Sequence, residues 1–184
     1  MDGDLDVCQS NFGPNFLWMN NGDTFFEQSE DVGINTNVLV NWDCHFFDYD
    51  LDGDMDLWFG VGRINLDIYN QYNSLYRNDG DVDGDGILDF TDVATEIGIA
   101  GTNKTMGAAL ADFDNDGDLD ILMAHADGPP QLWRNTAVED NSGHWLKVKL
   151  YGVNGGSNSH GIGCLVKVYL DDGTVLLQQA YAGD

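Results

Sequence analysis

An Asp-rich segment of nine residues recurs along this chain and constrains its fold more than any other feature. The complete copies span residues 48–56 (DYDLDGDMD) and 112–120 (DFDNDGDLD), and the last five positions recur at residues 2–6 (DGDLD). Each complete copy has Asp at every odd position and Gly at the sixth. This spacing predicts carboxylates gathered around a cation, at a sharp turn that a larger residue than Gly would obstruct.

The segments between these loops repeat as well, which predicts a chain of similar β units. After each loop comes a short apolar strand, and after a polar stretch comes an aromatic strand that ends in Asn. In the first two units a further segment closes on Gly-Ile, and another strand leads into the next loop. No helical periodicity of useful length is present. The predicted strand segments are 5–7, 16–20, 25–34, 38–47, 55–59, 74–78, 90–99, 106–113, 119–123 and 131–135.

Units of about four short strands, each too small to bury both of its faces, predict the blades of a β-propeller. The expected fold class is therefore all-β, with a partial propeller of four-stranded blades with Ca²⁺ loops. An open solenoid of stacked sheets is the alternative. Because the chain begins halfway through a repeat, we expect a fragment of something longer. Fewer than three complete blades cannot close a ring, so the missing blades are expected from sequence outside this chain or from other chains.

The character of the chain changes after Asn135. A polar linker is followed by residues 144–150, which alternate apolar and polar side chains and predict a half-buried strand. A loop rich in Gly, Ser and Asn comes next, and two further strands are predicted at 164–170 and 175–181. We expect propeller blades in residues 1–136, the first blade truncated, and a small, incomplete β module in residues 137–184.

The charge of the chain limits its partners. With 32 Asp and Glu against 7 Lys and Arg, the formal net charge is -25. Nucleic acid and anionic membrane surfaces would be repelled, whereas divalent cations are the natural counter-charge. No run of about 18 apolar residues occurs, so no membrane insertion is expected. No signal peptide is visible after Met1. Since the chain is expected to be a fragment, this absence is uninformative.

No catalytic motif is visible in the sequence, and the chain is predicted not to be an enzyme. It contains no nucleophile elbow, P-loop, Cys-x-x-Cys motif or dinucleotide-binding glycine pattern. Three cysteines are too few and too scattered for a zinc site or a disulfide framework. They are interpreted as small buried hydrophobic residues, with a bridge between Cys8 and Cys44 left open.

Each complete loop predicts one metal site. Positions one, three and five offer carboxylates, position seven a backbone carbonyl and position nine a closing carboxylate, a set of oxygen ligands that suits Ca²⁺ better than Mg²⁺. Two carboxylates about 4 Å apart repel by roughly 4 kcal/mol at an effective dielectric constant of 20, so an acidic loop without a cation would be strained. The predicted ligands are Asp48, Asp50, Asp52, Asp54 and Asp56 in one loop, and Asp112, Asp114, Asp116, Asp118 and Asp120 in the other.

A third site is predicted in an acidic insertion at residues 79–92. From Asp81 onward the spacing fits an EF-hand-type loop, with Gly86 at position six and Asp92 at position twelve. An acidic hairpin without metal is the alternative. The partial copy at residues 2–6 keeps too few ligands for tight binding. The predicted ligands of the third site are Asp81, Asp83, Asp85, Ile87, Asp89 and Asp92.

These motifs resemble those of known repeat families. The Asp-rich loops, followed by LYRN at 75–78 or LWRN at 132–135 and joined by FTDVATEIGI at 90–99, resemble FG-GAP/VCBS repeats, the units of integrin-α-like β-propellers. The tail, with HWLKVKL at 144–150 and SNSHGIG at 157–163, is similar to the ASPIC/UnbV domain that follows such repeats in secreted proteins of the CRTAC type. The resemblance implies an extracellular propeller that is stabilised by calcium and used for adhesion or ligand binding.

We therefore expect a calcium-binding extracellular repeat module that binds a protein or glycan ligand, or mediates cell adhesion, with structural Ca²⁺ in its loops. One alternative is an accessory or catalytic propeller of a carbohydrate-active enzyme, with a reactive cluster around His125 or residues 69–76. Another is a self-assembling subunit of an oligomer or filament, in which several copies supply one another's missing blades.

Overall fold

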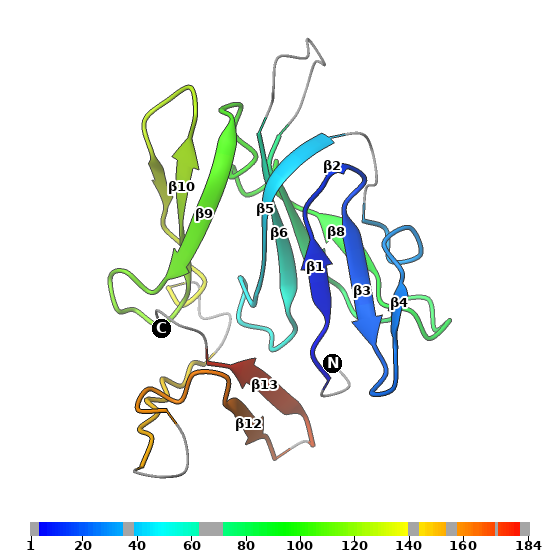
Figure 1. Ribbon diagram of the computed structural model, residues 1–184, viewed down its shortest axis with the longest axis vertical. Coiled ribbons are helices and arrows are strands. Elements are labelled where there is room, and N and C mark those ends of the chain that lie inside the picture. Colours follow the sequence, from blue (N-terminus) through cyan, green and yellow to red (C-terminus); the bar gives the residue numbers. More distant parts are fainter. Residues whose placement is uncertain are drawn as a thin grey trace. The chain divides into compact units, whose positions relative to one another are not determined.

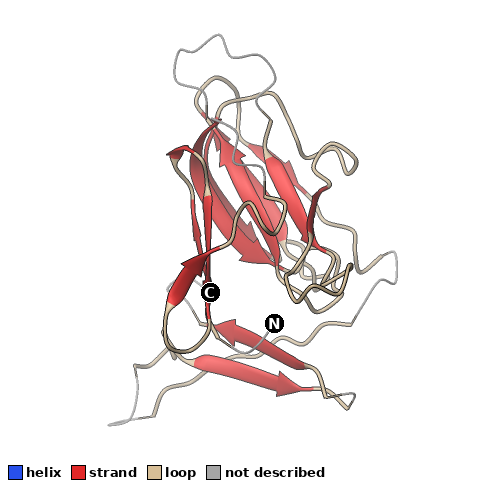
Figure 2. Ribbon diagram, turned by 90° about the vertical axis from the view of Figure 1, so that its right-hand side faces the viewer, coloured by secondary structure: helices blue, strands red, loops and turns tan. Residues whose placement is uncertain are grey.

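The computed structural model describes residues 4–34, 39–62, 72–139, 144–153, 158–171 and 173–180. These residues form thirteen strands and no helix (Figure 2), which confirms the predicted all-β class. The chain divides into two compact units, an N-terminal unit of Asp4–His144 and a C-terminal unit that contains Trp145–Asp184. The sequence had placed the boundary earlier, after residue 136.

Three antiparallel sheets make up the N-terminal unit (Figure 1). The first has the order β1 (Val7–Gln9), β3 (Phe16–Asn20), β4 (Phe25–Glu27). The second has the order β2 (Phe12–Gly13), β5 (Leu39–Phe47), β6 (Asp56–Val61), β7 (Ser74–Asn78), β8 (Phe90–Asp92). The third has the order β11 (Gln131–Trp133), β10 (Asp120–His125), β9 (Thr105–Ala111). In space the second sheet lies between the other two, because β5 contacts both β1 and β9.

The sheets follow the sequence repeats, as expected for a partial propeller. Strands β1, β6 and β10 each follow an Asp-rich loop, and each pairs with the aromatic strand of its own unit, β3, β7 or β11. The second sheet contains all four expected strands, β5 to β8. It also contains β2, which the sequence did not predict and which pairs through Phe12 with Val40 of β5.

Two apolar clusters hold the three sheets together, and they lie on opposite faces of β6. Successive side chains of a strand point to opposite faces, so Leu57 and Phe59 join one cluster and Trp58 the other. All residues of β6 are buried for this reason. The cluster with the first sheet contains Leu17, Val32, Ile34, Leu57, Phe59, Tyr76 and Phe90. The cluster with the third sheet contains Phe47, Trp58, Leu75, Val93, Ala94, Ile99, Ile121 and Met123.

The segments that close on Gly-Ile are strands only at their beginnings. β4 and β8 end at Glu27 and Asp92, and the chain then turns back on itself. The backbone N–H of Ile34 donates to the carbonyl of Ser29, and that of Ile99 to the carbonyl of Ala94, both at 2.9 Å. These turns carry the isoleucines into the two apolar clusters, which explains why the same pattern recurs in both units.

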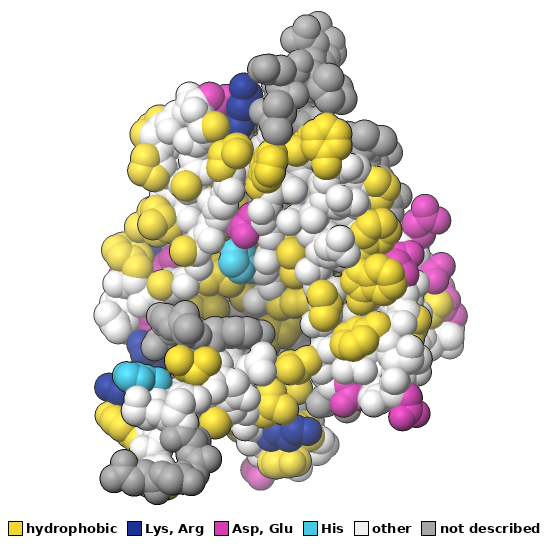
Figure 3. Space-filling view, viewed as in Figure 1, with side chains coloured by type: hydrophobic (Ala, Val, Ile, Leu, Met, Phe, Trp, Pro, Cys, Tyr) yellow, Lys and Arg dark blue, Asp and Glu magenta, His cyan; other side chains and the backbone are white. Residues whose placement is uncertain are grey.

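Hydrophobic side chains also reach the surface of the N-terminal unit. Figure 3 shows several of them over the region of β2, β3 and β4, where Phe12, Phe25 and Phe26 are exposed. On the third sheet, Leu122 and Leu132 are exposed while Ile121 is fully buried. One face of this sheet therefore packs on β5 and β6, and the other carries apolar groups without a covering sheet among the described residues.

The described strands of the C-terminal unit form a hairpin. β12 (Leu165–Tyr169) pairs with β13 (Val175–Gln179), as predicted, and the backbone N–H of Leu170 donates to the carbonyl of Thr174 across the turn. The strand predicted at residues 144–150 is wrong, because these residues are irregular and nearly all exposed. Alternation of polar and apolar side chains makes a strand only where a neighbouring strand pairs with it.

The described residues include no helix, and hence no helical segment with the length and apolar character needed to cross a membrane.

Candidate metal centres

The Asp at position nine of each complete loop fastens the loop to the neighbouring strand. Both oxygens of Asp56 accept backbone hydrogen bonds, from the N–H of Tyr49 in the loop (2.8 Å) and from that of Asn78 at the end of β7 (2.9 Å). Asp120 accepts in the same way from Phe113 and Asn135, at 2.9 Å each. Both Asp residues are almost fully buried. The closing carboxylate therefore has a structural role in both loops.

An Asn at the end of the aromatic strand completes this arrangement in all three units. Its side-chain amide donates to a loop carbonyl, and its side-chain oxygen accepts one or two backbone N–H groups from the residues that follow. The sequence pattern ends each aromatic strand in this Asn but predicts no role for it. Its recurrence at one place after each loop is the signal that could have revealed it. The residues are Asn20, Asn78 and Asn135, and the carbonyls are those of Leu5, Met55 and Tyr49.

The turn within each loop uses left-handed backbone conformations. In the loop 48–56 they occur at Leu51 (φ 60°) and Gly53 (φ 98°), and in the loop 112–120 at positions four and six again. The turn directs backbone N–H groups toward Asp48, whose oxygens accept from Asp52 (3.1 Å) and Gly53 (3.0 Å). Gly at position six is thus required by backbone geometry, as the sequence predicted.

The loop 48–56 brings together a triad of carboxylates. Asp48, Asp50 and Asp56 each offer an oxygen, and these oxygens lie within 4.8 Å of one another. Burial raises the pKa of Asp48 to about 6 and that of Asp56 to about 8, and it also raises the pKa of Asp50. Oδ1 of Asp50 is buried without a hydrogen-bond partner in the part of the chain that the structure describes. An unpaired oxygen among partly buried carboxylates fits a bound cation.

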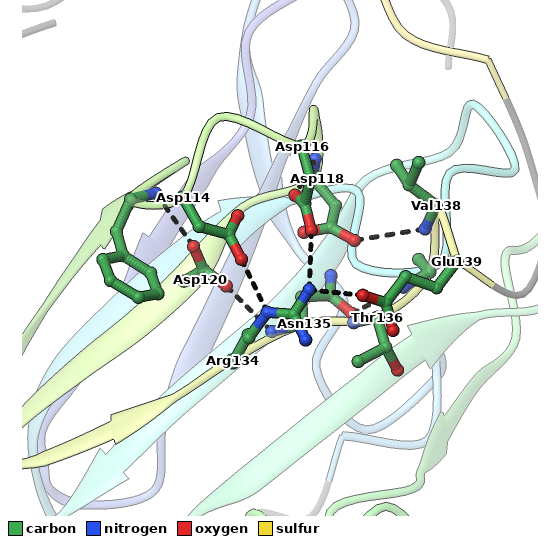
Figure 4. Close-up of polar contacts among 11 residues, drawn as sticks. Asp114, Asp116, Asp118, Asp120, Arg134, Asn135, Thr136, Val138 and Glu139 are labelled. Atoms are coloured by element: carbon green, nitrogen blue, oxygen red, sulfur yellow. Dashed lines mark hydrogen bonds and ion pairs between the residues drawn. The ribbon is translucent and has the colours of Figure 1, made fainter.

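The loop 112–120 gathers Asp112, Asp114 and Asp116, again within 4.8 Å, with position five in place of position nine. A guanidinium group lies beside two members of this triad, Asp114 and Asp116, as Figure 4 shows. Arg134 Nε lies 2.6 Å from Asp114 Oδ2, and its Nη2 lies 3.3 Å from Asp116 Oδ2 and also contacts Glu139. Arg134 lowers the pKa of Asp114. An internal cation therefore already balances part of the charge of this loop.

The remaining Asp residues of the two loops lie outside the triads. Asp118 was expected to offer its backbone carbonyl as a ligand. In the structure its side chain makes a hydrogen bond of its own. Its Oδ2 accepts from the backbone N–H of Val138 (3.1 Å), and burial raises the pKa of Asp118. Oδ1 of Asp52 accepts from the backbone N–H of Asp54 at 2.9 Å. These contacts shape the loops and leave the carbonyls at position seven as predicted ligands.

The acidic insertion follows the nine-residue arrangement of the other loops. Asp81 accepts from the N–H of Gly86 (3.0 Å), as Asp48 does from Gly53, and Asp89 accepts from the N–H of Val82 (2.9 Å). Asp81, Asp83 and Asp85 form a triad within 4.8 Å. All three are exposed, unlike the triad of the loop 48–56.

Two other residues predicted for the third site lie differently. Asp92 stands on β8, and its Oδ1 accepts from the N–H groups of Leu75 (3.4 Å) and Ala94 (3.1 Å), apart from the triad. The N–H of Ile87 donates to Oδ1 of Asp85 (2.8 Å). The insertion is therefore a nine-residue loop in its hydrogen bonding, and position twelve serves the strand pairing of β7 and β8.

Other candidate positions take no part in the triads. Asp2 of the partial copy and residues 69–71 lie outside the described residues. His125 contacts the hydroxyl of Thr105 (3.3 Å) and the side chain of Gln131 (3.0 Å), which links β10 to the strands on both sides. This histidine therefore contributes to the packing of β10 against β9 and β11.

Comparison with known proteins gives a partial match. No family model matches the chain. Over 118 residues the chain is 28% identical to Cartilage acidic protein 1 of Xenopus tropicalis, a match that covers 63% of this chain and 16% of that protein. The chain thus spans a small part of the length of the relative it matches. The similarity supports the predicted resemblance in general terms, and the assignment of FG-GAP/VCBS and ASPIC/UnbV units stays a prediction.

Proposed function

We propose that the N-terminal unit is a calcium-binding repeat module of an extracellular protein, in which the bound Ca²⁺ ions are structural. The observation that carries this proposal is the recurrence of one loop design. Three loops each gather three carboxylates within 4.8 Å, and each fixes the Asp at position nine by a backbone N–H from position two. An Asp triad recurs in three loops that share this closing hydrogen bond, and an acidic surface alone does not require that.

The ligand chemistry favours calcium over other metals. Every side-chain donor in the triads is a carboxylate oxygen, and Ca²⁺ takes six to eight such hard ligands in flexible loops. In the loop 48–56 the ion would be held by Asp48, Asp50, Asp52 and Asp56 and by the carbonyl of Asp54. The corresponding positions serve in the other two loops. When bound, Ca²⁺ neutralises carboxylates that otherwise repel one another between two strands.

The role we propose for the ions is architectural, and the chain is proposed to be a binding module without catalytic activity. Each loop joins strands or lies between them, so an ion in it would fix the edge of a blade. The ligand-binding surface would then lie on the loops between blades. Similarity to Cartilage acidic protein 1 supports an extracellular setting, and a protein or a glycan is the proposed ligand.

Calcium titration of chelator-stripped protein tests the metal sites. Asp50→Asn should weaken binding at one site by about tenfold or more, because it removes a charged ligand whose buried oxygen has no other described partner. Asp54→Asn is the matched control, since it removes the same charge from the same loop and spares the predicted carbonyl ligand. If both variants weakened calcium binding equally, the effect of Asp50→Asn would come from the loss of charge in general and not from the loss of a ligand.

Thermal unfolding provides a second test of the structural role. Excess EDTA should lower the melting temperature and expose the loops to proteolysis, and added Ca²⁺ should reverse both effects. The metal hypothesis is wrong if EDTA changes neither. Binding to arrays of glycans and of extracellular proteins, with Ca²⁺ and with EDTA, then tests the proposed ligand classes. Binding that requires Ca²⁺ is the expected result.

A further inference from the structure

The structure brings two cysteines from different sheets into contact. Cys8 stands in the middle of β1, opposite Leu17 of β3, and Cys44 stands in β5, opposite Phe59 of β6. Their Sγ atoms are 2.6 Å apart. Both side chains pack against the apolar cluster between the first and second sheets. The pair is thus sheltered and its two sulfur atoms point toward each other.

The separation of the two sulfurs is close to that of a covalent bond. An S–S bond measures about 2.05 Å, so the sulfurs would have to approach by roughly half an ångström. The strands themselves are not paired with each other, because β1 belongs to the first sheet and β5 to the second.

We propose that Cys8 and Cys44 form a disulfide that covalently joins the first sheet to the second. The bond would supplement the apolar cluster that the structure shows between these two sheets. This inference does not depend on metal binding. Cys164, in the C-terminal unit, would keep its thiol.

The oxidant in this proposal is a small disulfide such as oxidised glutathione, which is itself reduced. The hydrogen bond from Cys8 lowers the pKa of Cys44 and raises that of Cys8, which makes Cys44 the attacking thiolate. It attacks one sulfur of oxidised glutathione, forms a mixed disulfide and releases one glutathione thiolate. Cys8 then loses its proton to water and attacks the Cys44 sulfur, which releases the second thiolate. Two protein thiols are oxidised, and one glutathione disulfide is reduced to two thiols.

The bond would constrain the unfolded chain. It joins residues 36 positions apart, and the enclosed segment contains β2, β3 and β4. A cross-link of this span restricts the unfolded ensemble, so the oxidised protein should melt about 5–15 °C above the reduced protein. The first sheet should benefit most, because the bond prevents its separation from the second.

Thiol counting on the full chain tests the proposal. The protein is equilibrated with oxidised and reduced glutathione, denatured, labelled with a maleimide mass tag and digested. The expected result is one labelled thiol, Cys164, and a linked pair of peptides that contain Cys8 and Cys44. Cys164→Ser should keep the linked pair and the melting shift, and Cys8→Ser should show two labelled thiols and a melting temperature independent of glutathione.

Three results would overturn the proposal. They are labelling of all three thiols in excess oxidised glutathione, a bond from Cys164 to either partner, and a bond between two chains. The comparison of oxidised with reduced wild-type protein decides the matter even if the Cys8→Ser variant fails to fold. Repeating the labelling in EDTA and in Ca²⁺ should give the same linked pair.

Discussion

At the scale of single residues, a buried side-chain amide ties the metal loop 48–56 to the segment that follows β11. Asn135 is almost fully buried, and its Nδ2 donates to the carbonyl of Tyr49 at 2.7 Å. Tyr49 belongs to the loop of the second sheet, whereas Asn135 follows the last strand of the third. This hydrogen bond therefore connects two neighbouring blades, which the equivalent bonds of Asn20 and Asn78 do not.

Replacing Asn135 by Ala should lower the free energy of unfolding by about 1–3 kcal/mol, because it leaves buried backbone groups without partners. The loss should appear with Ca²⁺ and with EDTA alike, since the amide is not a metal ligand. Urea unfolding followed by Trp fluorescence measures it. Asn20→Ala is the matched control, and it should cost less because Asn20 is half-exposed and bonds only within its own unit. A loss confined to the calcium-loaded protein would contradict this assignment.

Arginine occupies the same position in two repeats but forms different ion pairs in each. Arg134 contacts Asp114 and Asp116, whereas Arg77 at the equivalent position pairs with Asp79 outside the triad. The first repeat has Met19 there. A guanidinium that bonds two proposed ligands must give them up, at least in part, when Ca²⁺ binds.

Arg134→Met should therefore tighten calcium binding at the loop 112–120 by roughly 2–10-fold, and more at low salt than at high salt. Calorimetric titration at two ionic strengths measures the change. Arg77→Met removes the same charge from the equivalent position and should have a smaller effect, which separates displacement of a ligand contact from general charge. Weaker binding in Arg134→Met would instead mean that the arginine supports the loop.

At the scale of elements, the sequence predicted the strands that follow the Asp-rich loops, because loop and strand signals coincide there. It did not predict β2, whose two residues form a strand only because Val40 lies opposite Phe12. It also predicted a strand at residues 144–150 from the alternation of apolar and polar side chains alone. Asp92 was assigned by spacing to a metal loop, and its carboxylate instead caps backbone groups at β7 and β8. Val40 and Leu75, which decide the roles of Phe12 and Asp92, are distant from them in sequence, so local pattern could not identify them.

The contact between β5 and β9 contains a titratable pair. Asp43 Oδ2 accepts from the backbone N–H of Ala108 (2.6 Å) and lies 3.1 Å from Nε2 of His45. The hydrogen bond with Asp43 raises the pKa of His45 above its ordinary value of 6.5. A raised pKa in the folded state means that the protonated histidine stabilises the fold. This contribution is complete below about pH 6.5 and is lost as the pH rises through the raised pKa.

His45→Gln should consequently destabilise the protein more at pH 6 than at pH 9. Unfolding by urea at both pH values, in saturating Ca²⁺ to keep the loop carboxylates ionised, gives the difference between variant and wild type. His160→Gln, in the C-terminal unit, is the control and should leave this difference near zero. A difference that is constant with pH would show that His45 acts through packing alone.

At the scale of the whole molecule, the three triads all lie in the N-terminal unit. Two of the loops lead directly into β6 and β10, the strands whose side chains fill the apolar clusters between the sheets. The third interrupts the connection between β7 and β8. The sequence predicted this arrangement because loop and strand recur together. It could not show that β6 serves both clusters, since burial of a strand on two faces depends on which sheets flank it.

Removal of calcium should therefore loosen one unit and spare the other. Hydrogen exchange measured by mass spectrometry should show faster exchange in EDTA at residues 48–61 and 112–125, and at β5 and β9 that pair with them, because ligand binding stabilises the elements that form the site. β12 and β13 should exchange at the same rate with and without Ca²⁺. Asp50→Asn in saturating Ca²⁺ should speed exchange at 48–61 more than at 112–125, whereas Asp54→Asn should resemble wild type. Equal acceleration in both units would mean that EDTA acts on the fold as a whole and that the loops do not hold the ions.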